Sequence, residues 1–579
     1  MLVYLVASDL EVPAVNDLEN MVKAPSSPDV EVIVQIGGGA TPGAYPGIDM
    51  QKTQRYRLVP AQPSQAGNEV VGNGWKLERL PQAQQPAQVA MNVSSTLQDF
   101  IEWGTKSYPA EQFHLALWNH GGGPVHGFGF DKALGAGQGM TVADITLAIR
   151  NAGVHFEMVG FDACLMASLE VAAALQPYAN YLVASEEVTM GWDWSAVVGH
   201  MVSQPLASGH SLGQAIVESY KPFWRTNMYG KVDFTAYAVT DLRAVPALVQ
   251  ALESAFSELQ RQLDTRGIEA WTGIAAARHA AEDFQSGLFV FGAYDLVDVF
   301  SFMEKLAQRG WISNDAMHAI ESAHMQAVLV NDGGEDEAHG LMMYFPAISV
   351  QRNDILTKYS SLEFSPAILG FVERYARWVH SSQMPQVTVD GVQLNGHNLV
   401  ATVNSNQPGI PTALSGAYAV LYDGMHAVAM QPMSAQGNAL ELADAANWPT
   451  LGGEVVSLIP EGDQDNVFLI PVESDGDRGM LYAFKDAKGA LNVRLFAGAN
   501  TSAGAGMSML EVHPGQTFFP LRMNMTSMKL EAADEAVVAP VGDWVVEMQS
   551  MQGNHYSLRA VAVDLAGRLN LSAQSTPLP

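Results

Sequence analysis

The sequence predicts an α/β fold: a mostly parallel sheet flanked by helices and followed by one or two small β-sandwich domains. Its first 380 residues alternate short, nearly continuous apolar runs with longer amphipathic runs. This order is typical of parallel strands that helices cover on both faces. From Pro385 onward the segments become shorter, alternate apolar with polar residues and are separated by frequent turns, which favours β-sandwiches. Because 48% of the 579 residues are hydrophobic and only 16% are charged, the chain can bury a large core.

The predicted elements of the first part follow one another as strand and helix. The strands are the short apolar runs Leu2–Ala7, Val30–Ile36, Phe113–Trp118, Glu157–Phe161, Tyr181–Ala184, Phe234–Val239 and Leu341–Phe345. The helices are the amphipathic runs Val12–Lys23, Ser95–Lys106, Val142–Asn151, Leu165–Leu175, Leu212–Phe223, Val245–Leu263, Asn314–Val328 and Pro366–His380. In such folds the ligand crevice lies beyond the carboxyl ends of the strands, so we expect the chemistry there.

Residues 37–90 interrupt this alternation. They are rich in Gly, Pro and Gln, and they contain two strand candidates, Gln54–Val59 and Trp75–Leu80. We interpret them as an inserted hairpin and a loose loop. The chain is thus expected to comprise a main domain over 1–380 and one or two β-sandwich accessory domains over 385–579.

The charge balance restricts the partners. Thirty basic residues against sixty acidic ones give a net charge of −30. Such a chain repels phosphate backbones and anionic lipid, which disfavours nucleic-acid and membrane-surface binding. No apolar run reaches the length of about 18–20 residues that a membrane span needs. The negative field favours a cationic substrate, although solubility alone also explains it.

The chain has a single cysteine, Cys164, so neither an intrachain disulfide nor a cysteine-rich zinc site can form. Three acidic loops, Asp332–Glu337, Glu461–Asp465 and Glu473–Asp477, do not match the twelve-residue calcium loop. We therefore expect no required cofactor and no metal site. Calcium binding stays open as an alternative that no motif supports.

The strand Phe113–Trp118 leads into His120, which is followed by three glycines, Gly121 to Gly123. Glycines bend the backbone sharply and leave their N–H groups accessible. Such N–H groups beside a histidine can form an oxyanion hole next to a general base. The alternative is a tight turn with a capping histidine.

Cys164 follows the strand Glu157–Phe161 and precedes the helix predicted from Leu165. It should therefore lie at the carboxyl edge of the sheet and at a helix amino terminus, where the helix dipole lowers the pKa of a thiol. If its strand neighbours that of His120, a cysteine–histidine dyad follows. The alternative is a buried cysteine that acts as a small apolar side chain.

At these residues the sequence resembles the clostripain family, part of the caspase-like clan of cysteine peptidases. The resemblance covers roughly residues 1–380 and does not extend to 385–579. The motifs occur in order around the histidine and the only cysteine: Tyr4–Glu11, Asp17–Glu19, Phe100–Trp103, Tyr108–Ala110, Gly127–Asp131, Met140–Asp144, Ala184–Glu187, Gly191–Trp194 and Gly340–Pro346.

The resemblance implies a role for each matching residue. Cys164 would be the nucleophile, His120 the general acid and base, and the N–H groups of Gly121 and Cys164 the oxyanion hole. The family cleaves proteins or peptides after Arg or Lys, and Asp162 and Asp193 match its acidic pocket. Two partly desolvated carboxylates would bind a guanidinium or ammonium and reject an apolar side chain. The alternatives are a helix cap for Asp162 and a turn residue for Asp193.

The resemblance also implies self-cleavage between the two catalytic residues, and Lys132 lies in a Gly-rich segment suited to it. Arg150 lies in a predicted helix and is a poorer site. Family members are largely exported, whereas Met1 leads directly into a strand with no leader. We therefore expect a secreted or periplasmic mature form. Some members need calcium and others do not.

Two other functions compete with the peptidase. Gly209 to Gly213 fits the Gly-x-Ser-x-Gly elbow of serine esterases, with Ser211 as nucleophile. However, no apolar strand precedes it, and Pro205 argues against one. The other alternative is a non-catalytic binding protein with a decayed peptidase domain, against which the intact His120, Cys164 and aspartates count.

Overall fold

The computed structural model describes residues 1–578 except for thirteen short segments. The segments left out are 40–47, 62–74, 135–138, 228–235, 285–293, 333–337, 348–352, 380–384, 407–413, 461–466, 500–506, 525–528, 552–555 and residue 579 itself. The proposed boundary between 380 and 385 and most of the first two acidic loops therefore lie outside the described residues.

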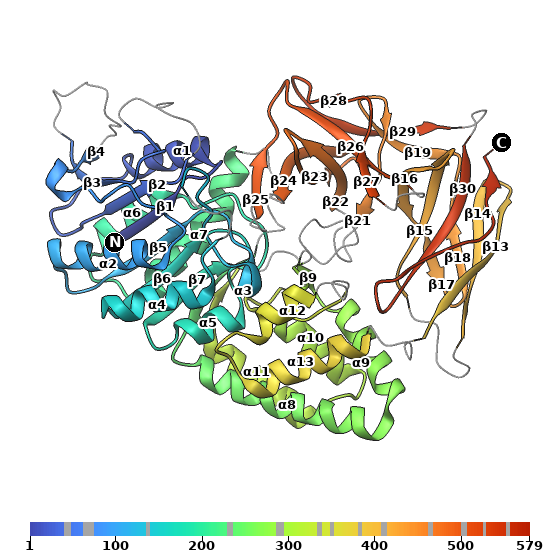
Figure 1. Ribbon diagram of the computed structural model, residues 1–579, viewed down its shortest axis with the longest axis horizontal. Coiled ribbons are helices and arrows are strands. Elements are labelled where there is room, and N and C mark those ends of the chain that lie inside the picture. Colours follow the sequence, from blue (N-terminus) through green and yellow to red (C-terminus); the bar gives the residue numbers. More distant parts are fainter. Residues whose placement is uncertain are drawn as a thin grey trace.

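A nine-stranded sheet forms the N-terminal half, in the order β11-β8-β7-β6-β5-β1-β2-β3-β4 (Figure 1). Its five central strands are parallel: β1 Leu2–Val6, β2 Ile33–Gly37, β5 His114–Trp118, β6 Phe156–Asp162 and β7 Ala179–Ser185. Its edges are antiparallel: β3 Gln54–Pro60, β4 Trp75–Arg79, β8 Tyr237–Asp241 and β11 Val328–Asn331. The predicted α/β class with a mainly parallel sheet is confirmed. The hairpin expected as an insertion instead extends the sheet, because β3 pairs with β2.

Helices cover both faces of this sheet. Along β1, Leu2, Tyr4 and Val6 face one apolar core, whereas Val3 and Leu5 face the other. The first core takes α2 Ser94–Ser107, α4 Val142–Ala152 and α5 Leu169–Leu175. The second core takes α1 Glu11–Met21, α6 Trp194–Ser203 and α7 Gly209–Asn227. This two-sided burial explains why the central strands are nearly continuous apolar runs.

A helical layer continues the first core. It comprises α8 Val245–Arg266, α9 Ile268–Ala280, α10 Val299–Gln308, α11 Asn314–Ala327, α12 Asn353–Ser360 and α13 Pro366–Val379. A separate three-stranded sheet within it contains β9 Asp283–Phe284, β10 Leu296–Asp298 and β12 Met342–Tyr344. The strand predicted at Leu341–Phe345 therefore exists, but it pairs with β10 rather than with the main sheet. The remaining short helices are η1 Gln82–Gln84 and α3 Gly123–His126.

The C-terminal region consists of antiparallel strands. A four-stranded sheet has the order β13 Val387–Asn395, β14 Asn398–Ser405, β18 Ala439–Leu442 and β17 Ser434–Gln436. A larger curled sheet contains β15 Leu414–Asp423, β16 His426–Pro432, β19 Asn447–Leu451, β20 Glu454–Val455, β21 Ile459–Pro460, β22 Val467–Ser474, β23 Asp477–Lys485, β24 Leu491–Ala499, β25 Met507–Glu511, β26 Thr517–Asn524, β27 Lys529–Ala532, β28 Val537–Val538, β29 Val545–Ser550, β30 Ser557–Asp564, β31 Leu569–Leu571 and β32 Thr576–Pro577. The division into one or two sandwich domains stays a prediction.

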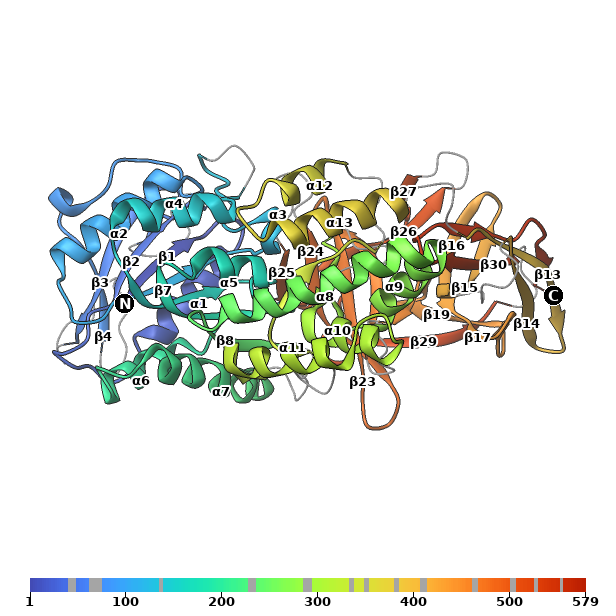
Figure 2. The ribbon, with the colours of Figure 1, turned by 90° about the horizontal axis from the view of Figure 1, so that it is seen from below.

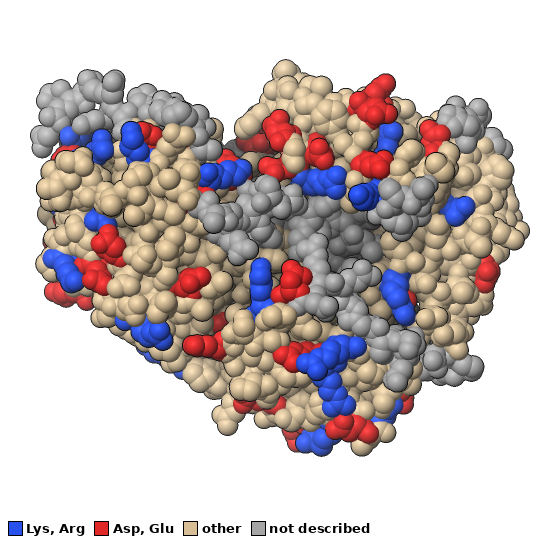
Figure 3. All heavy atoms as spheres, in the orientation of Figure 1, with Lys and Arg blue, Asp and Glu red and all other residues tan. Residues whose placement is uncertain are grey.

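The carboxyl ends of the parallel strands face this C-terminal region. The short helix α3, which follows β5, packs against α5, α12 and β12, and β25 is the C-terminal strand at the boundary between the two parts (Figures 1 and 2). Leu510 of β25 packs against the second core of the sheet, and His279 Nε2 lies 3.1 Å from the carbonyl oxygen of Leu565. Acidic and basic side chains gather along the notch between the two parts (Figure 3). None of the described helices is long and apolar enough to cross a membrane.

Candidate active site

Three neighbouring parallel strands end at one edge of the sheet in the spatial order β6, β5, β1. Trp118 pairs with Asp162 across β5 and β6, and Leu5 pairs with Trp118 across β1 and β5. His120 and Cys164 each lie two residues beyond the first of these pairs. The sheet therefore brings the two predicted catalytic residues to the same edge on adjacent strands.

His120 is almost completely buried, with 1% of its surface exposed. Its Nε2 lies 2.7 Å from Asp9 Oδ1, and its Nδ1 has no hydrogen-bond partner among the described residues. The ring of Phe130 packs edge-on against the imidazole, with 6.1 Å between centroids. The histidine is thus fixed through Nε2 and has Nδ1 available for chemistry.

Cys164 is also buried, at 2% exposure. Its Sγ accepts a hydrogen bond from the backbone N–H of Thr189 at 3.2 Å. Burial raises the pKa of the Cys164 thiol to about 12, and the charges of Glu187 and Asp162 act in the same direction. In this conformation the thiol is therefore protonated.

The expected lowering of the Cys164 pKa is wrong for this conformation. The helix predicted from Leu165 begins only at Leu169, where Ser168 caps it by accepting from the N–H of Val171. Leu165 has φ of 61°, which a helix cannot contain. The helix dipole therefore starts about one turn too late to act on Cys164.

Gly121 lies directly against the backbone of Cys164. A Cβ added to Gly121 would lie 2.0 Å from the carbonyl oxygen of Cys164, so no other residue fits there. The backbone hydrogen bonds on either side of Gly121 run from the N–H of Gly122 to the carbonyl of Gly127 and from the N–H of Gly129 to the carbonyl of His120. The N–H of Gly121 takes part in neither. Among the described residues, neither this N–H nor that of Cys164 donates to a backbone carbonyl. Both groups are thus available for an oxyanion.

Two buried carboxylates lie close together behind this edge. Asp162 accepts a hydrogen bond from Trp194 Nε1 at 2.9 Å, and Asp17 accepts one from Trp118 Nε1 at 2.8 Å. Burial raises the pKa of both carboxyls, and the charge of Asp162 further raises that of Asp17. Asp162 Oδ1 has no hydrogen-bond partner among the described residues. Asp162 is thus a buried carboxyl and not a helix cap, since Ser168 caps α5.

Gly191 marks where the two carboxylates converge. It has φ of 110°, and an added Cβ would lie 3.3 Å from Asp17 Oδ2 and 3.7 Å from Asp162 Oδ1. Asp193, the second predicted pocket residue, caps α6 by accepting from the N–H of Ala196 at 3.2 Å. Its charge still reaches Asp17 and raises the pKa of that carboxyl.

Asp17 was not predicted as a site residue. Its sequence position, on the amphipathic helix that follows the first strand, gives no chemical indication of its own. The register of α1 against the sheet places it beside Asp162, and only the tertiary fold contains that information.

Lys132, the predicted self-cleavage residue, lies in a turn near His120. Its Nζ is 3.1 Å from Asp9 Oδ2. The hairpin tip between β22 and β23, with Asp475 and Gly476 at φ of 52° and 84°, also approaches this group. Burial raises the pKa of Asp477 at this tip, while the nearby charges of Lys132 and His120 oppose the rise. The C-terminal region therefore reaches the catalytic edge.

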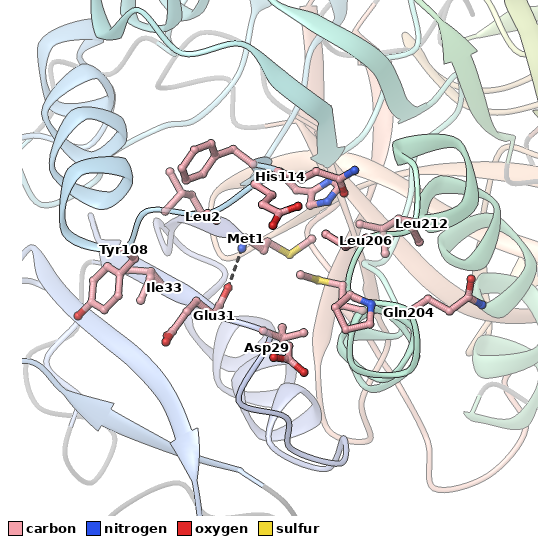
Figure 4. Close-up of a pocket in the computed structure, with 18 of the residues that line it drawn as sticks. Met1, Leu2, Asp29, Glu31, Ile33, Tyr108, His114, Gln204, Leu206 and Leu212 are labelled. Carbon is pink, nitrogen blue, oxygen red and sulfur yellow. Dashed lines mark hydrogen bonds between the residues drawn. The ribbon is translucent and has the colours of Figure 1, made fainter.

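Ser211 does not form a nucleophile elbow. It lies in the first turn of α7, no strand directly precedes it, and its Oγ is 3.1 Å from His200 Nε2. His200 lines a cavity of about 830 Å³ at the amino ends of β1 and β5, together with Met1, Glu31 and His114 (Figure 4). This cavity lies at the sheet edge opposite to His120.

Among the described residues there is no cluster of three His, Cys, Asp or Glu side chains that could hold a metal ion.

The fold and site define a class: an α/β protein with a cysteine and a histidine at the carboxyl ends of adjacent parallel strands, as in cysteine hydrolases. The model of the clostripain family matches residues 3–345. The chain therefore belongs to the clostripain family of cysteine peptidases, as the sequence motifs predicted. No curated protein matches this chain.

Solved structures of similar proteins were also found. One is a secreted C11 cysteine protease from Bacteroides thetaiotaomicron in complex with an irreversible peptide inhibitor. It is 16% identical to this chain, and the match spans 65% of this chain and 98% of that protease, with a TM-score of 0.47. Another is an inactive zymogen C11 protease from Parabacteroides distasonis, 15% identical, covering 62% of this chain and 96% of its own, with a TM-score of 0.45.

Proposed function

We propose that this protein is a cysteine endopeptidase that hydrolyses peptide bonds after Arg or Lys, with Cys164 as nucleophile and His120 as general acid and base. The observation that carries the proposal is the pairing of β5 with β6, which sets both residues two positions beyond one register pair. Family membership supports the reaction class independently.

The geometry suggests a role for each group in the reaction. His120 Nδ1 takes the proton of the Cys164 thiol, and the resulting thiolate attacks the scissile carbonyl carbon. The oxyanion accepts hydrogen bonds from the N–H groups of Gly121 and Cys164. His120 Nδ1 gives its proton to the leaving amine. A water molecule, deprotonated by the same nitrogen, then hydrolyses the thioester.

The preference for Arg or Lys rests on the carboxylates. Asp162 and Asp17 are buried and adjacent, and Asp193 adds a third negative charge nearby. A guanidinium or ammonium inserted among them would gain charge-assisted hydrogen bonds, and Asp162 Oδ1 offers an unpartnered acceptor. An apolar side chain would leave the same carboxylates desolvated without compensation.

The covered thiol suggests that the described conformation is a resting form. Before attack, Sγ must lose the N–H of Thr189 and gain access to a substrate. Cleavage after Lys132 is the activation step we propose, since the segment that follows it connects the histidine strand to α4. No required cofactor enters this scheme.

The test uses three fluorogenic peptides that end in Arg, Lys or Asp, with wild type, Cys164→Ala and Ser211→Ala as a matched control. We expect cleavage of the Arg and Lys peptides by the wild type and Ser211→Ala, and none by Cys164→Ala. Cleavage of the Asp peptide alone would contradict the acidic pocket. Inactivity of the wild type on all three, also after limited proteolysis near Lys132, would favour the non-catalytic binding protein instead.

A further inference from the structure

The opening strand delivers a third polar side chain to the catalytic edge. β1 lies beside β5 and parallel to it, so the residues that follow both strands emerge on the same side. Asp9 lies three residues beyond the end of β1, and His120 two residues beyond the end of β5. In the spatial order of the strands, the side chains are therefore cysteine, histidine and aspartate.

A tight turn aims Asp9 at the histidine. The N–H of Leu10 donates to the carbonyl of Ala7 at 2.7 Å, and Ser8 within this turn has φ of 49°. A non-glycine residue adopts such a left-handed conformation at a cost, which the surrounding structure must offset. Ser8 is fully buried, so the packing around it holds the turn in place.

The contact itself is short and polar. Asp9 Oδ1 lies 2.7 Å from His120 Nε2, with 30% of the aspartate side chain and 1% of the histidine exposed. An ionised carboxylate can only accept, so Nε2 carries the proton and donates it to Asp9. Burial alone would raise the pKa of Asp9, but His120 and Lys132 outweigh it and hold that pKa well below its usual range.

We propose that Asp9 is the positioning residue of His120: it accepts a hydrogen bond from Nε2–H, fixes the tautomer that keeps Nδ1 free, and stabilises the imidazolium. The proposal rests on the proposed function. When the imidazolium gives its Nδ1 proton to the leaving amine, Asp9 stays ionised and receives no proton. The charges that face this pair are Lys132, bound to the other carboxylate oxygen, and Asp477 on the hairpin tip.

The test compares Asp9→Asn with Asp332→Asn. Asp332 is a matched control because it also forms an ion pair with a lysine, Lys221, at 2.8 Å, and 27% of its side chain is exposed. It follows β11, which lies at an edge of the sheet away from β1 and β5. We expect kcat of Asp9→Asn on the Arg peptide to fall about 100-fold with KM changed less than about twofold. The acidic limb of its pH profile should move to lower pH, because His120 Nδ1 must be unprotonated to take the thiol proton and the imidazolium has lost its counter-charge.

Asp9→Glu should recover part of kcat, whereas a purely structural carboxylate would affect thermal unfolding without moving the pH profile. Mass spectrometry of each variant checks that altered cleavage after Lys132 is not the cause. Equal kcat and pH profiles for Asp9→Asn and wild type would overturn the proposal, while loss of activity in Cys164→Ala and His120→Ala would still support the peptidase.

A measurement on the wild type keeps the proposal testable if Asp9→Asn does not fold. With ¹⁵N-labelled histidine, NMR should show a proton on Nε2 and none on Nδ1 for the resonance that His120→Gln removes. A proton on Nδ1 of neutral His120 would refute the assigned tautomer and with it the role of Asp9.

Discussion

Replacement of Gly121 by alanine should disable catalysis while the protein stays folded. A Cβ at this position would lie 2.0 Å from the Cys164 carbonyl oxygen, whereas ordinary contacts begin at 3.4 Å. The two backbone segments must therefore separate by about 1.4 Å, and a misplacement of roughly 1 Å can already cost 10²-fold in rate. We expect kcat/KM on the Arg peptide to fall at least about 100-fold, equivalent to about 2.7 kcal/mol of transition-state stabilisation.

The control for this change is Gly153→Ala. Gly153 ends α4 with φ of 67° and has nothing within 4 Å of an added Cβ, so alanine there costs stability by backbone strain alone. Its kcat/KM should match the wild type, although thermal unfolding moves to lower temperature. If Gly121→Ala folds and retains more than a third of the wild-type kcat/KM, the oxyanion geometry assigned to Gly121 and Cys164 is wrong.

Three further outcomes follow from the same site. Burial raises the pKa of Cys164 from 9.0 to about 12. Iodoacetamide at pH 8 should therefore alkylate this thiol up to about 10³-fold more slowly than a free cysteine. An alkylation rate equal to that of glutathione would contradict the covered thiol. Cleavage after Lys132 should yield fragments 1–132 and 133–579, which mass spectrometry detects. We expect them from the wild type and Lys132→Arg, but not from Lys132→Gln or Cys164→Ala. The same fragments from Cys164→Ala would point to an external protease. Asp162→Asn should abolish cleavage after Arg yet be more stable to denaturant than wild type at pH 8, by about 1–4 kcal/mol. The gain should be smaller at pH 5, and a variant that is destabilised equally at both pH values would contradict the buried carboxyl pair.

The core of the fold could be predicted because its strands are buried on both faces. Runs such as Leu2–Val6 and Leu115–Trp118 are apolar throughout, and period and length alone identify them. The pairing of β12 with β10 rather than with the main sheet could not be predicted, since strand partners depend on long-range packing. The same holds for the pairing of the predicted β3–β4 hairpin with β2, which extends the main sheet.

The candidate site could be predicted in part for a related reason. His120 and Cys164 each lie two residues beyond a recognisable strand, so adjacency of the two strands places them at the same edge of the sheet. Asp9 and Asp17 carry no such pattern: one lies in a three-residue turn, the other within a helix, and their partners are more than a hundred positions away in sequence. The delayed start of α5 was hidden because Leu165 to Ala167 are as apolar as the helix itself, although Ser168 is the capping residue.

The two buried carboxyls explain how the proposed pocket can both exist in the free protein and favour a cation. Burial raises the pKa of Asp162 and of Asp17, so at neutral pH the pair holds a proton that the unfolded chain would release. Since the folded state binds the extra proton, its stability is complete below the ordinary carboxyl pKa of 3.8 and declines as the pH rises toward the raised values. A bound guanidinium reverses this effect because it stabilises both carboxylates in the ionised form and expels the proton. Neutral or acidic side chains cannot do so. In the proposed pocket, the carboxyl pair would therefore favour Arg and Lys over them.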